Sequence, residues 1–453
     1  MASVTIAPAK AGRLLLANLG LDGFEHARRV RASTRATKPS PTATSHVIAA
    51  TKPMSSARVR RRLLTIGHSY CVSVNRRLAH ELARAGSWDV TVVGPSRFRG
   101  DFSWHVLTPA QDERCHVAPI PVRCGRQVHV MTYARQLRDL LQQPWDLVHC
   151  WEEPYVAAAA QVAAWTPVRV PLVLATFQNI DKRYPPPFRW FEQYAFGRAD
   201  GLIAFGRTVL DVAVAHGFSA ARARVIPPGV DTTRFAPDPD VRARVRTSLG
   251  WGDEVPVIGF LGRFVQQKGV TLLTEVLERL GPPWRALFVG SGPLEPTLRT
   301  WAARHRPRVA VVRASHDEVP SWLNAMDVLC APSQTTPAWR EQFGRMIIEA
   351  FAVGVPVVAS RSGEIPFVVG DAGVLVPEDD RTAWARALTD LLTDAGRRSA
   401  FSEKGRARAL AHYDWSVVAR HHDAFFTEVI EGFPATGSLG PVAAHDPRVR
   451  RGA

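Results

Sequence analysis

Short apolar runs alternate with amphipathic stretches along most of the chain. Between residues 62 and 235, the runs are separated by longer stretches whose apolar positions follow helical spacing. This alternation predicts a parallel β-sheet that is covered by helices on both faces. The strand-like runs are RLLTIG (62–67), DVTVVGP (89–95), WDLVHCW (145–151), PLVLATF (171–177), GLIAFG (201–206) and ARVIPPGV (223–230).

A second alternation of the same kind follows a polar, proline-rich break, APDPD, at 236–240. We therefore expect two consecutive α/β domains, at 58–238 and 239–412, with a hinge near 236–254. The second set of runs begins with VPVIGFLGR and ends with AGVLVP. Helical spacing near the carboxyl terminus predicts three closing helices, at about 380–394, 396–411 and 415–431.

The two ends of the chain differ from the domains in composition and charge. Residues 1–57 and 433–453 carry little periodic apolar pattern, and we expect both to be disordered. Residues 1–62 have a net charge of +10 and the tail has +2, which leaves +4 of the total +16 for the domains. Solvated tails explain this charge, and weak attraction to an anionic membrane or to nucleic acid is the alternative. Met54 is a second candidate for the native start, so residues 1–53 stay an open question.

Cysteine spacing and hydropathy indicate where in the cell the protein resides. The five cysteines are scattered and form no Cys-x-x-Cys pair, which argues against a disulfide framework or a zinc site. No apolar stretch approaches the roughly 20 residues that span a bilayer. We expect a cytoplasmic protein with at most weak peripheral contact at the inner face of the membrane, and no specific nucleic-acid partner.

Two strand ends in the second domain carry residues that suit phosphate binding. In FLGRFVQQKGV, Gly262 and Arg263 follow the strand and Lys268 precedes the next helix, so the two cations can converge on a diphosphate. In LFVGSGP, the turn Gly290–Gly292 offers backbone amides and the Ser291 hydroxyl to a phosphate or a base. For each stretch alone, an ordinary tight turn is an equally good explanation.

The segment WREQFGRMIIEAF (339–351) carries two glutamates with seven residues between them. Apolar periodicity begins after Gly344, which predicts a helix start there and outward-pointing amides at Phe343 and Gly344 that suit a phosphate oxygen. Glu341 would lie on a loop beside a hydroxylated group, and Glu349 inside the helix could accept two hydrogen bonds from a ribose diol. A solvated loop charge and a helix residue turned toward water are the alternatives.

Taken together, these motifs resemble the retaining glycosyltransferases of the GT-B fold, often called the group 1 or family 4 type. The resemblance rests on the Gly-Arg…Lys-Gly turn, the Val-Gly-Ser-Gly-Pro turn and the Glu-x-Phe-Gly-x4-Glu motif, in that order. It is strong over about 255–412 and looser over about 62–235. It implies two Rossmann-like domains whose parallel sheets face each other across a cleft, with the acceptor on the first domain, the nucleotide sugar on the second, and a helix at about 414–432 that returns to the first.

The resemblance also implies roles by position. Arg263 and Lys268 would hold the donor diphosphate, Glu341 would lie beside the donor sugar hydroxyls, and Glu349 would bind the ribose. Such enzymes need no metal in the site and no cofactor beyond the nucleotide-sugar co-substrate, and the leaving phosphate oxygen is usually pictured as taking the acceptor's proton. We therefore assign Glu341 neither as nucleophile nor as general base. The remaining donor-side residues would be Gly262, Gly290, Ser291, Gly292, Val319, Pro320, Phe343 and Gly344.

The first domain departs from the pattern of its relatives. Many of them carry a glycine-rich loop after the first strand, where this chain has IGHSYCVSVNRR, and a histidine where this chain has Gln178. The acceptor-side candidates are His68, His149, Glu152 and Gln178, with Glu153, Asn179 and Lys182 behind them. For His149, a strand-end histidine satisfied within the fold is an equal alternative.

The function expected from the sequence is retaining transfer of a hexose-like sugar from a nucleotide-diphosphate sugar such as a UDP or GDP sugar. The acceptor would be a carbohydrate or lipid-linked hydroxyl compound in polysaccharide, glycolipid or glycoconjugate biosynthesis. Two alternatives stay open: a sugar-nucleotide epimerase of the same fold, and an inactive protein that only binds sugar nucleotides. The donor sugar, the base, the acceptor and the oligomeric state are not determined by the sequence.

Overall fold

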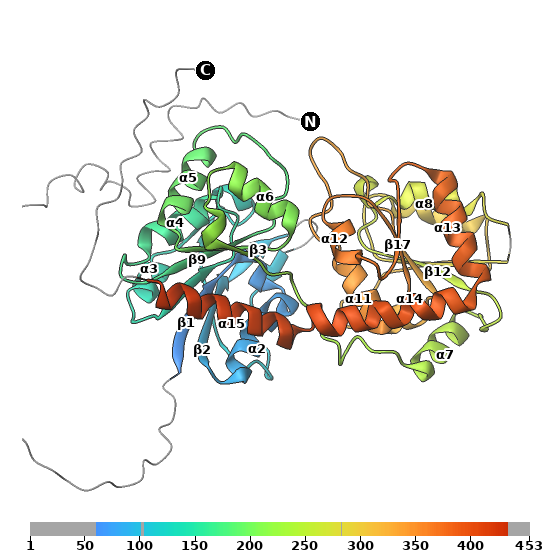
Figure 1. The fold of residues 1–453 in the computed structure, drawn as a ribbon, viewed down its shortest axis with the longest axis horizontal. Coiled ribbons are helices and arrows are strands. Elements are labelled where there is room, and N and C mark those ends of the chain that lie inside the picture. The colour runs from blue at the N-terminus through green and yellow to red at the C-terminus, as the bar shows by residue number, and fades with distance from the viewer. Residues whose placement is uncertain (1–59, 101–103, 282, 434–453) are drawn as a thin grey trace, which may run out of the picture.

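Two parallel β-sheets, joined by a linker and by a helix that returns to the first, form the structure (Figure 1). The computed structural model describes residues 60–100, 104–281 and 283–433. The segments predicted to be disordered, 1–57 and 433–453, lie outside these residues apart from Phe433, so that prediction stays untested. None of the helices in the described ranges combines the length and the apolar character that crossing a membrane requires.

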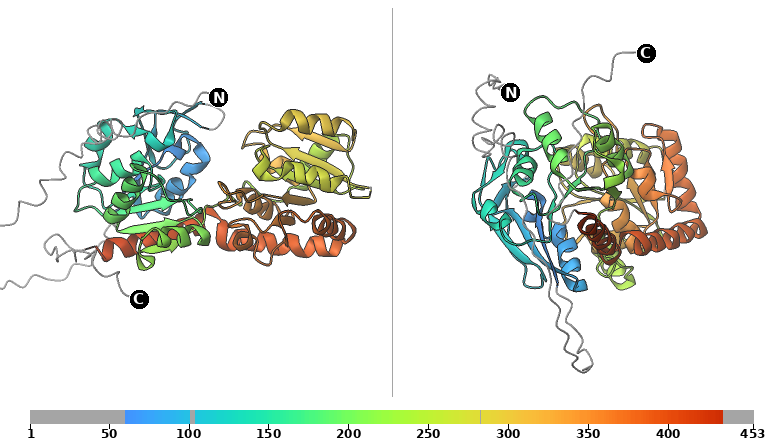
Figure 2. Two further views of the ribbon diagram at one scale, coloured as in Figure 1. Left: turned by 90° about the horizontal axis from the view of Figure 1, so that it is seen from above. Right: turned by 60° about the vertical axis from the view of Figure 1, so that its left-hand side comes forward.

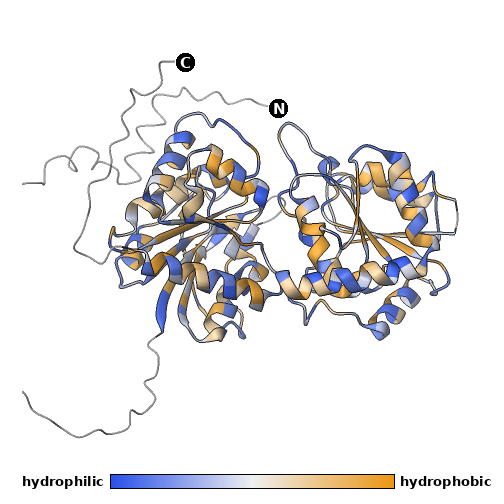
Figure 3. Ribbon diagram, in the orientation of Figure 1, coloured by the Kyte–Doolittle hydropathy of each residue, from blue (hydrophilic) through white to orange (hydrophobic). Residues whose placement is uncertain are grey.

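The first sheet has seven strands in the order β11-β10-β9-β8-β1-β2-β5, and every neighbouring pair is parallel. Its central strands β8, β9 and β10 are buried at every position, which is why their sequences are continuous apolar runs. In Figure 3 the strands of this domain are mostly coloured as hydrophobic, whereas the helices around them carry both hydrophobic and hydrophilic residues. The strands span Arg61–Ile66 (β1), Trp88–Pro95 (β2), His116–Ile120 (β5), Leu147–Cys150 (β8), Leu172–Thr176 (β9), Gly201–Ala204 (β10) and Ala223–Val225 (β11).

Five α-helices and two small hairpins complete this domain. The helices are Arg77–Ala85 (α2), Gln136–Leu141 (α3), Ala157–Trp165 (α4), Phe188–Arg198 (α5) and Arg207–Ala215 (α6). The hairpins pair Arg97–Arg99 (β3) with Trp104–Val106 (β4), and Val122–Arg123 (β6) with Thr132–Tyr133 (β7). The described part of this domain also has four short 3₁₀ helices: His68–Cys71 (η2), Ser73–Arg76 (η3), Val128–Val130 (η4) and Ala220–Arg222 (η5).

The stretch 130–143 has helical spacing, yet only its second half is helical. The side-chain amide of Gln161 on α4 accepts a hydrogen bond from the Tyr133 N–H at 2.7 Å and donates one to the Tyr133 carbonyl at 2.9 Å. These two bonds hold Tyr133 in an extended strand conformation. A tertiary contact therefore overrides the local helical pattern at this point.

The second sheet has six strands in the order β14-β13-β12-β15-β16-β17, again all parallel. The strands span Val257–Leu261 (β12), Arg285–Val289 (β13), Val309–Val312 (β14), Val328–Ala331 (β15), Val357–Ser360 (β16) and Val374–Val376 (β17). The helices around it are Pro239–Ser248 (α7), Val270–Leu277 (α8), Glu295–Ala303 (α9), Val319–Asn324 (α10), Arg345–Val353 (α11), Ile365–Val369 (α12), Arg381–Thr393 (α13) and Ala395–Arg408 (α14). The predicted hinge thus contains a helix, α7, which Asp238 caps and Pro239 begins.

The chain ends in a long helix that crosses from the second domain back to the first (Figures 1 and 2). A π-helical turn at Ala409–Tyr413 joins α14 to this helix, α15, which spans Trp415–Glu431. On the first domain, the Trp88 indole N–H donates to Asp423 at 2.6 Å. At the crossing itself, a Cβ atom on Gly229 would lie 2.5 Å from the Trp415 ring, so only glycine allows the linker this close to α15.

A carboxylate from the second domain caps a helix of the first. Helix α6 starts after Gly206 and has no side-chain cap of its own. The buried Glu364 carboxylate accepts hydrogen bonds from the Arg207 N–H at 2.7 Å, the Thr208 N–H at 2.9 Å and the Thr208 hydroxyl at 2.7 Å. A negative charge at the amino end of a helix is favourable, because the first amides have no partner within the helix. Glu364 therefore contributes to holding the two domains together.

We expect Glu364→Ala to lower the stability of the protein by about 1–3 kcal/mol, because two backbone amides and one hydroxyl lose a charged acceptor in a buried interface. Urea denaturation followed by fluorescence checks this. Glu403→Ala, which changes an exposed glutamate on α14, is the matched control and should leave the midpoint unchanged. Equal midpoints for the Glu364 variant and the control would show that the interdomain cap does not contribute.

Candidate active site between the two domains

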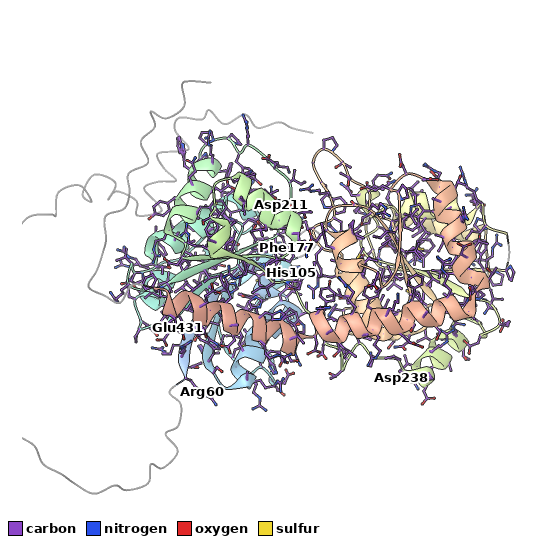
Figure 4. All side chains as sticks on the ribbon, viewed as in Figure 1. Arg60, His105, Phe177, Asp211, Asp238 and Glu431 are labelled. Carbon is purple, nitrogen blue, oxygen red and sulfur yellow. The ribbon has the colours of Figure 1, made fainter. Side chains whose placement is uncertain are left out.

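A cavity of about 620 Å³ lies between the two domains, and residues of both domains line it. Its wall includes residues that directly follow β1, β8 and β9 of the first sheet and β12 of the second. Ligands of open α/β sheets bind at such carboxyl ends of strands. Figure 4 shows Phe177, one of the lining residues, on the side of the first domain that faces the second. We call this space the central cavity.

Most of the predicted donor-side residues do line the central cavity. The structure brings together the loop after β12, the segment before α11 and the inner face of α11 itself. Loops that lie far apart in the sequence thus converge because they follow strands of one parallel sheet. The predicted residues in the lining are Gly262, Arg263, Lys268, Val319, Glu341, Phe343, Gly344 and Glu349.

Lys268, which is partly exposed, and the buried Glu341 form an ion pair in this wall. The Lys268 Nζ lies 2.5 Å from the Glu341 Oε2, and the Ser333 hydroxyl donates to the same oxygen at 2.7 Å. Burial alone would raise the pKa of the Glu341 carboxyl. The charge and hydrogen bond of Lys268, with hydrogen bonds from Ser333 and the Phe343 amide, instead hold that pKa below its ordinary value. Glu341 is therefore ionised, and part of the Lys268 charge is already balanced.

The segment around Glu341 is also bonded to the first domain. The Asn179 side-chain amide donates to the Glu341 carbonyl at 2.9 Å, and the Gln342 amide donates to the Phe177 carbonyl at 3.1 Å. Lys182 donates to the Ala338 carbonyl at 3.3 Å. The loop after β9, which the sequence marked as a weak acceptor-side candidate, thus holds the Glu341 loop across the cavity.

The helix that carries Glu349 begins at the left-handed residue Gly344, whose φ is +86°. A side chain there would be strained, so glycine suits the sharp entry into α11. One and a half turns later, Glu349 is buried at the cavity wall. Burial raises the pKa of its carboxyl to about 7, although the charges of Arg345 and Arg234 partly oppose this shift.

The predicted turn Gly290–Gly292 supports the cavity from behind and is not part of its lining. The Phe264 N–H donates to the Ser291 carbonyl at 2.8 Å, and a Cβ atom on Gly290 would lie only 1.9 Å from the Gly262 carbonyl oxygen. These contacts fix the loop that carries Arg263. Pro320 likewise lies in the first turn of α10 outside the lining, whereas its neighbour Val319 reaches the cavity.

On the first-domain wall, His68 lines the cavity. Glu152 lies outside the lining and binds His68. Glu152 accepts hydrogen bonds from the His68 N–H at 2.7 Å and from the Tyr133 hydroxyl at 3.0 Å, and its Oε2 lies 2.5 Å from the His68 Nδ1. The neighbouring Glu153 also lines the cavity, and burial raises the pKa of its carboxyl.

The other two acceptor-side candidates, like Glu152, do not line the central cavity. His149 is buried within the first sheet, where its Nδ1 lies 2.9 Å from the Thr65 hydroxyl, and burial lowers its pKa to about 3. It is a neutral core residue, the alternative that its strand-end position left open. Gln178 turns its amide toward the Ile180 carbonyl at 2.7 Å and the Tyr184 hydroxyl at 2.6 Å. It fixes the loop after β9 and does not replace a cavity-facing histidine.

Several lining residues could not be found from local sequence patterns. Arg345 follows the recognised motif directly, and its guanidinium donates to the Asn75 side chain of the first domain at 3.1 Å. His316 and Trp415 enter the wall from a loop and from the start of α15. Other unpredicted members include the aromatic residues Trp151, Tyr155 and Phe177. Within the described residues there is no group of three or more His, Cys, Asp or Glu side chains that could hold a metal ion.

Both domains match known protein families. Residues 255–394 match the family described as glycosyl transferases group 1, and residues 72–234 match glycosyltransferase family 4. The chain is 39% identical over 232 residues to a GDP-mannose-dependent alpha-(1-6)-phosphatidylinositol monomannoside mannosyltransferase of Mycolicibacterium smegmatis, a match that covers 49% of this chain and 59% of that protein. It is 31% identical over 316 residues to a D-inositol 3-phosphate glycosyltransferase of Corynebacterium jeikeium, which covers 66% and 71%. The chain thus spans less than two thirds of the first relative.

Solved structures confirm the predicted GT-B architecture. A glycosyltransferase of Rickettsia africae has a TM-score of 0.66 at 14% identity, over 82% of this chain and 99% of that one. Anabaena HepE, solved in complex with UDP, has a TM-score of 0.64 at 18% identity, over 81% and 100%. At these identities the likeness concerns the fold alone.

The Lys268–Glu341 pair makes a testable contribution to stability. We expect Lys268→Met to destabilise the protein by about 1–3 kcal/mol, because it leaves a buried carboxylate without its cation. Adding Glu341→Gln to the same chain should recover most of the loss, since the remaining groups are then uncharged. Urea denaturation of the wild type, both single variants and the double variant measures the coupling.

The same pair predicts a pH dependence. The pKa of Glu341 is lowered in the folded state, so its contribution is present above the unfolded pKa of a glutamate and is lost as the pH falls through the folded value. The gap in stability between wild type and Lys268→Met should therefore narrow in acid. A gap that is constant from neutral to acidic pH would contradict the ion pair as the source.

Proposed function

The chain belongs to the group 1, family 4 glycosyltransferases, and from that premise we propose that it transfers a sugar from a nucleotide-diphosphate sugar to a hydroxyl acceptor with retention of anomeric configuration. The observation that carries this proposal is the central cavity, where two cations and two carboxylates at the predicted positions face the first domain. Arg263 and Lys268 supply positive charge for a diphosphate, and Glu349 offers a carboxylate for a ribose diol.

The charges in the wall suit departure of a nucleoside diphosphate. As the bond between the anomeric carbon and the diphosphate breaks, negative charge grows on the leaving oxygen, and fixed cations lower the barrier when they lie near that charge. Lys268 can shift from Glu341 toward the diphosphate, because its Nζ already lies at the cavity wall. In this arrangement the cations take the place that a divalent metal has in other transferases, so we propose that the reaction needs no metal.

The names of the relatives suggest which substrates to test first. The Mycolicibacterium smegmatis relative is named as a GDP-mannose-dependent enzyme, and the Corynebacterium jeikeium relative is named for D-inositol 3-phosphate. We propose an inositol-containing phospholipid or inositol phosphate as acceptor and GDP-mannose as donor. A lipid-linked acceptor would also bring the protein to a membrane surface.

The first test is nucleotide release. We expect GDP release from GDP-mannose to depend on the presence of either 1D-myo-inositol 3-phosphate or phosphatidylinositol mannoside in detergent micelles, and to persist in EDTA. UDP-glucose and ADP-glucose, each with the same acceptors, serve as comparison donors. Arg263→Gln should lower turnover at least tenfold while the melting temperature changes little.

Two outcomes would overturn the transfer proposal. Conversion of the donor to an epimer without acceptor consumption would indicate an epimerase. Donor binding by calorimetry without turnover on any of these acceptors would indicate a protein that only binds the sugar nucleotide.

Donor binding should depend on the ionisation of Glu349. Because burial raises the pKa of Glu349 to about 7 and a diol donates to the ionised form, GDP-mannose affinity should rise between about pH 6 and pH 8. Glu349→Gln should weaken binding about 10- to 100-fold at pH 8 and flatten this rise. Calorimetry measures both effects. Glu275→Gln, which changes a half-exposed glutamate of α8 that pairs with Arg381 outside the cavity, is the control. Identical pH curves for both variants would refute the assignment.

A further inference from the structure

His68 lies at the junction of the central cavity and a second cavity of about 1070 Å³ in the first domain. Four described residues belong to both linings: His68, Ser69, Asn75 and Val128. The second cavity extends from this junction toward β3, η4 and the start of α5. An acceptor that occupies the second cavity would therefore reach the donor past the His68 imidazole.

The imidazole is held in one orientation. Glu152 binds the His68 backbone N–H through Oε1 and the ring Nδ1 through Oε2, at 2.7 and 2.5 Å. A carboxylate offers only acceptors, so the proton of this bond belongs to Nδ1. On its other side the ring packs against Phe98, with centroids 5.1 Å apart. The neutral ring therefore has its lone pair on Nε2, which is the tautomer that a general base needs.

Glu152 is held in place by the domain around it. It is 1% exposed, and its further partner is the Tyr133 hydroxyl at 3.0 Å. The Gln161 amide fixes the Tyr133 backbone, as described above. Across the described residues, the cationic partner that lies within 4 Å of Glu152 is His68. The carboxylate thus stabilises a proton on His68.

The other bases in the central cavity are engaged elsewhere. Glu341 binds Lys268 and Ser333, and Glu153 accepts from the Phe177 N–H at 2.9 Å and from the Thr176 hydroxyl. Glu349 and His316 lie where the central cavity meets a third cavity of about 390 Å³, which shares none of the second cavity's lining residues. Of the bases that line the central cavity, His68 is the one that also lines the second cavity.

We propose that His68 is the general base of the transfer, and that Glu152 orients its ring and stabilises its protonated form. This proposal rests on the transfer proposed above. The acceptor O–H bond breaks and its proton passes to the His68 Nε2, while the acceptor oxygen forms a bond to the anomeric carbon on the face from which the diphosphate departs, as retention requires. The bond from that carbon to the diphosphate breaks, and its electron pair leaves with the nucleotide. The imidazolium then returns its proton to solvent through the open cavity. His68 thus takes the role that is usually given to the leaving phosphate.

The environment of His68 predicts the sign of a pH dependence. Burial lowers the pKa of His68, but the charge and hydrogen bond of Glu152, together with the charge of Glu153, raise it above its ordinary value. The neutral ring is the active form, so activity should fall as the pH drops through this pKa. The titratable groups facing His68 from neighbouring elements are Glu152, Glu153, Tyr133 and Tyr155; across the cavities they are Cys71, Arg99, His105, Arg126, His129, Tyr184, Arg263, Lys268, His316, Glu341, Arg345 and Glu349.

The test is a pH profile of kcat for GDP release from GDP-mannose, with 1D-myo-inositol 3-phosphate or phosphatidylinositol mannoside as acceptor. His68→Gln should lower kcat about 100-fold and remove the acidic limb of the profile. Glu152→Gln should move that limb to lower pH, since the charge that raises the pKa of His68 is gone. Tyr133→Phe should move it to higher pH, because Glu152 then loses a competing donor.

The control variant is His305→Gln, which removes another histidine bonded to a glutamate, Glu278, at 2.8 Å but outside all three cavities. Its profile should match the wild type. Melting temperature and calorimetry with GDP-mannose establish that each variant is folded and binds the donor. If Glu152→Gln does not fold, Tyr133→Phe and His68→Gln still decide the matter.

Three results would overturn the assignment. Activity that falls as the pH rises through the histidine range would show that the charged ring is needed. An acidic limb that survives in His68→Gln would place the base elsewhere. Full activity of His68→Gln would show that the ring has no chemical role. Complete absence of transfer by the wild type, with donor binding intact, would instead contradict the proposed function and is thereby distinguished.

Discussion

The burial of Glu341 is the constraint on which the arrangement of this protein depends. Its carboxylate pairs with Lys268 and accepts a hydrogen bond from Ser333. Its backbone carbonyl accepts hydrogen bonds from Asn179 of the first domain and from the Glu364 N–H, the latter at 3.0 Å. Glu364 in turn caps α6. One residue therefore connects the loop after β12, the start of α12 and both domains. The buried carboxylate needs its cation, since removing that cation costs about 1–3 kcal/mol.

The same interaction explains how the unliganded site can be stable and still bind anions. A lysine that faced only other cations would repel them and weaken the fold. Pairing Lys268 with Glu341 keeps the cation at the wall while its charge is balanced. A diphosphate that arrives beside Arg263 offers Lys268 a second acceptor, so binding exchanges partners without creating a new buried charge. The account of the leaving group above follows from this exchange.

Much of the architecture follows from local sequence. The continuous apolar runs predicted twelve of the strands, because strands covered on both faces need apolar side chains at every position. Because ligands of open α/β sheets bind at the carboxyl ends of the strands, Gly262, Arg263, Lys268 and Glu349 could be expected at one site, and they line one cavity. Among the elements that were not predicted, β5 is an edge strand with mixed exposure, and α4 is buried nearly all round and so lacks an amphipathic pattern. Which of two histidines reaches the cavity was also beyond the sequence. His149 lies inside a strand and His68 lies just after one. Their different roles are shown by their contacts, which are the Thr65 hydroxyl for His149 and the Glu152 carboxylate for His68.

The central claim is that a nucleotide sugar binds in the cavity between the domains with its phosphates at the Lys268–Glu341 pair. A crystal structure of the protein with GDP tests it most directly. The account predicts the diphosphate against Arg263 and Lys268, the ribose hydroxyls on the Glu349 carboxylate, and a longer distance between the Lys268 Nζ and Glu341. GDP bound elsewhere, or bound here with its ribose turned away from Glu349 and the ion pair unchanged, would contradict it.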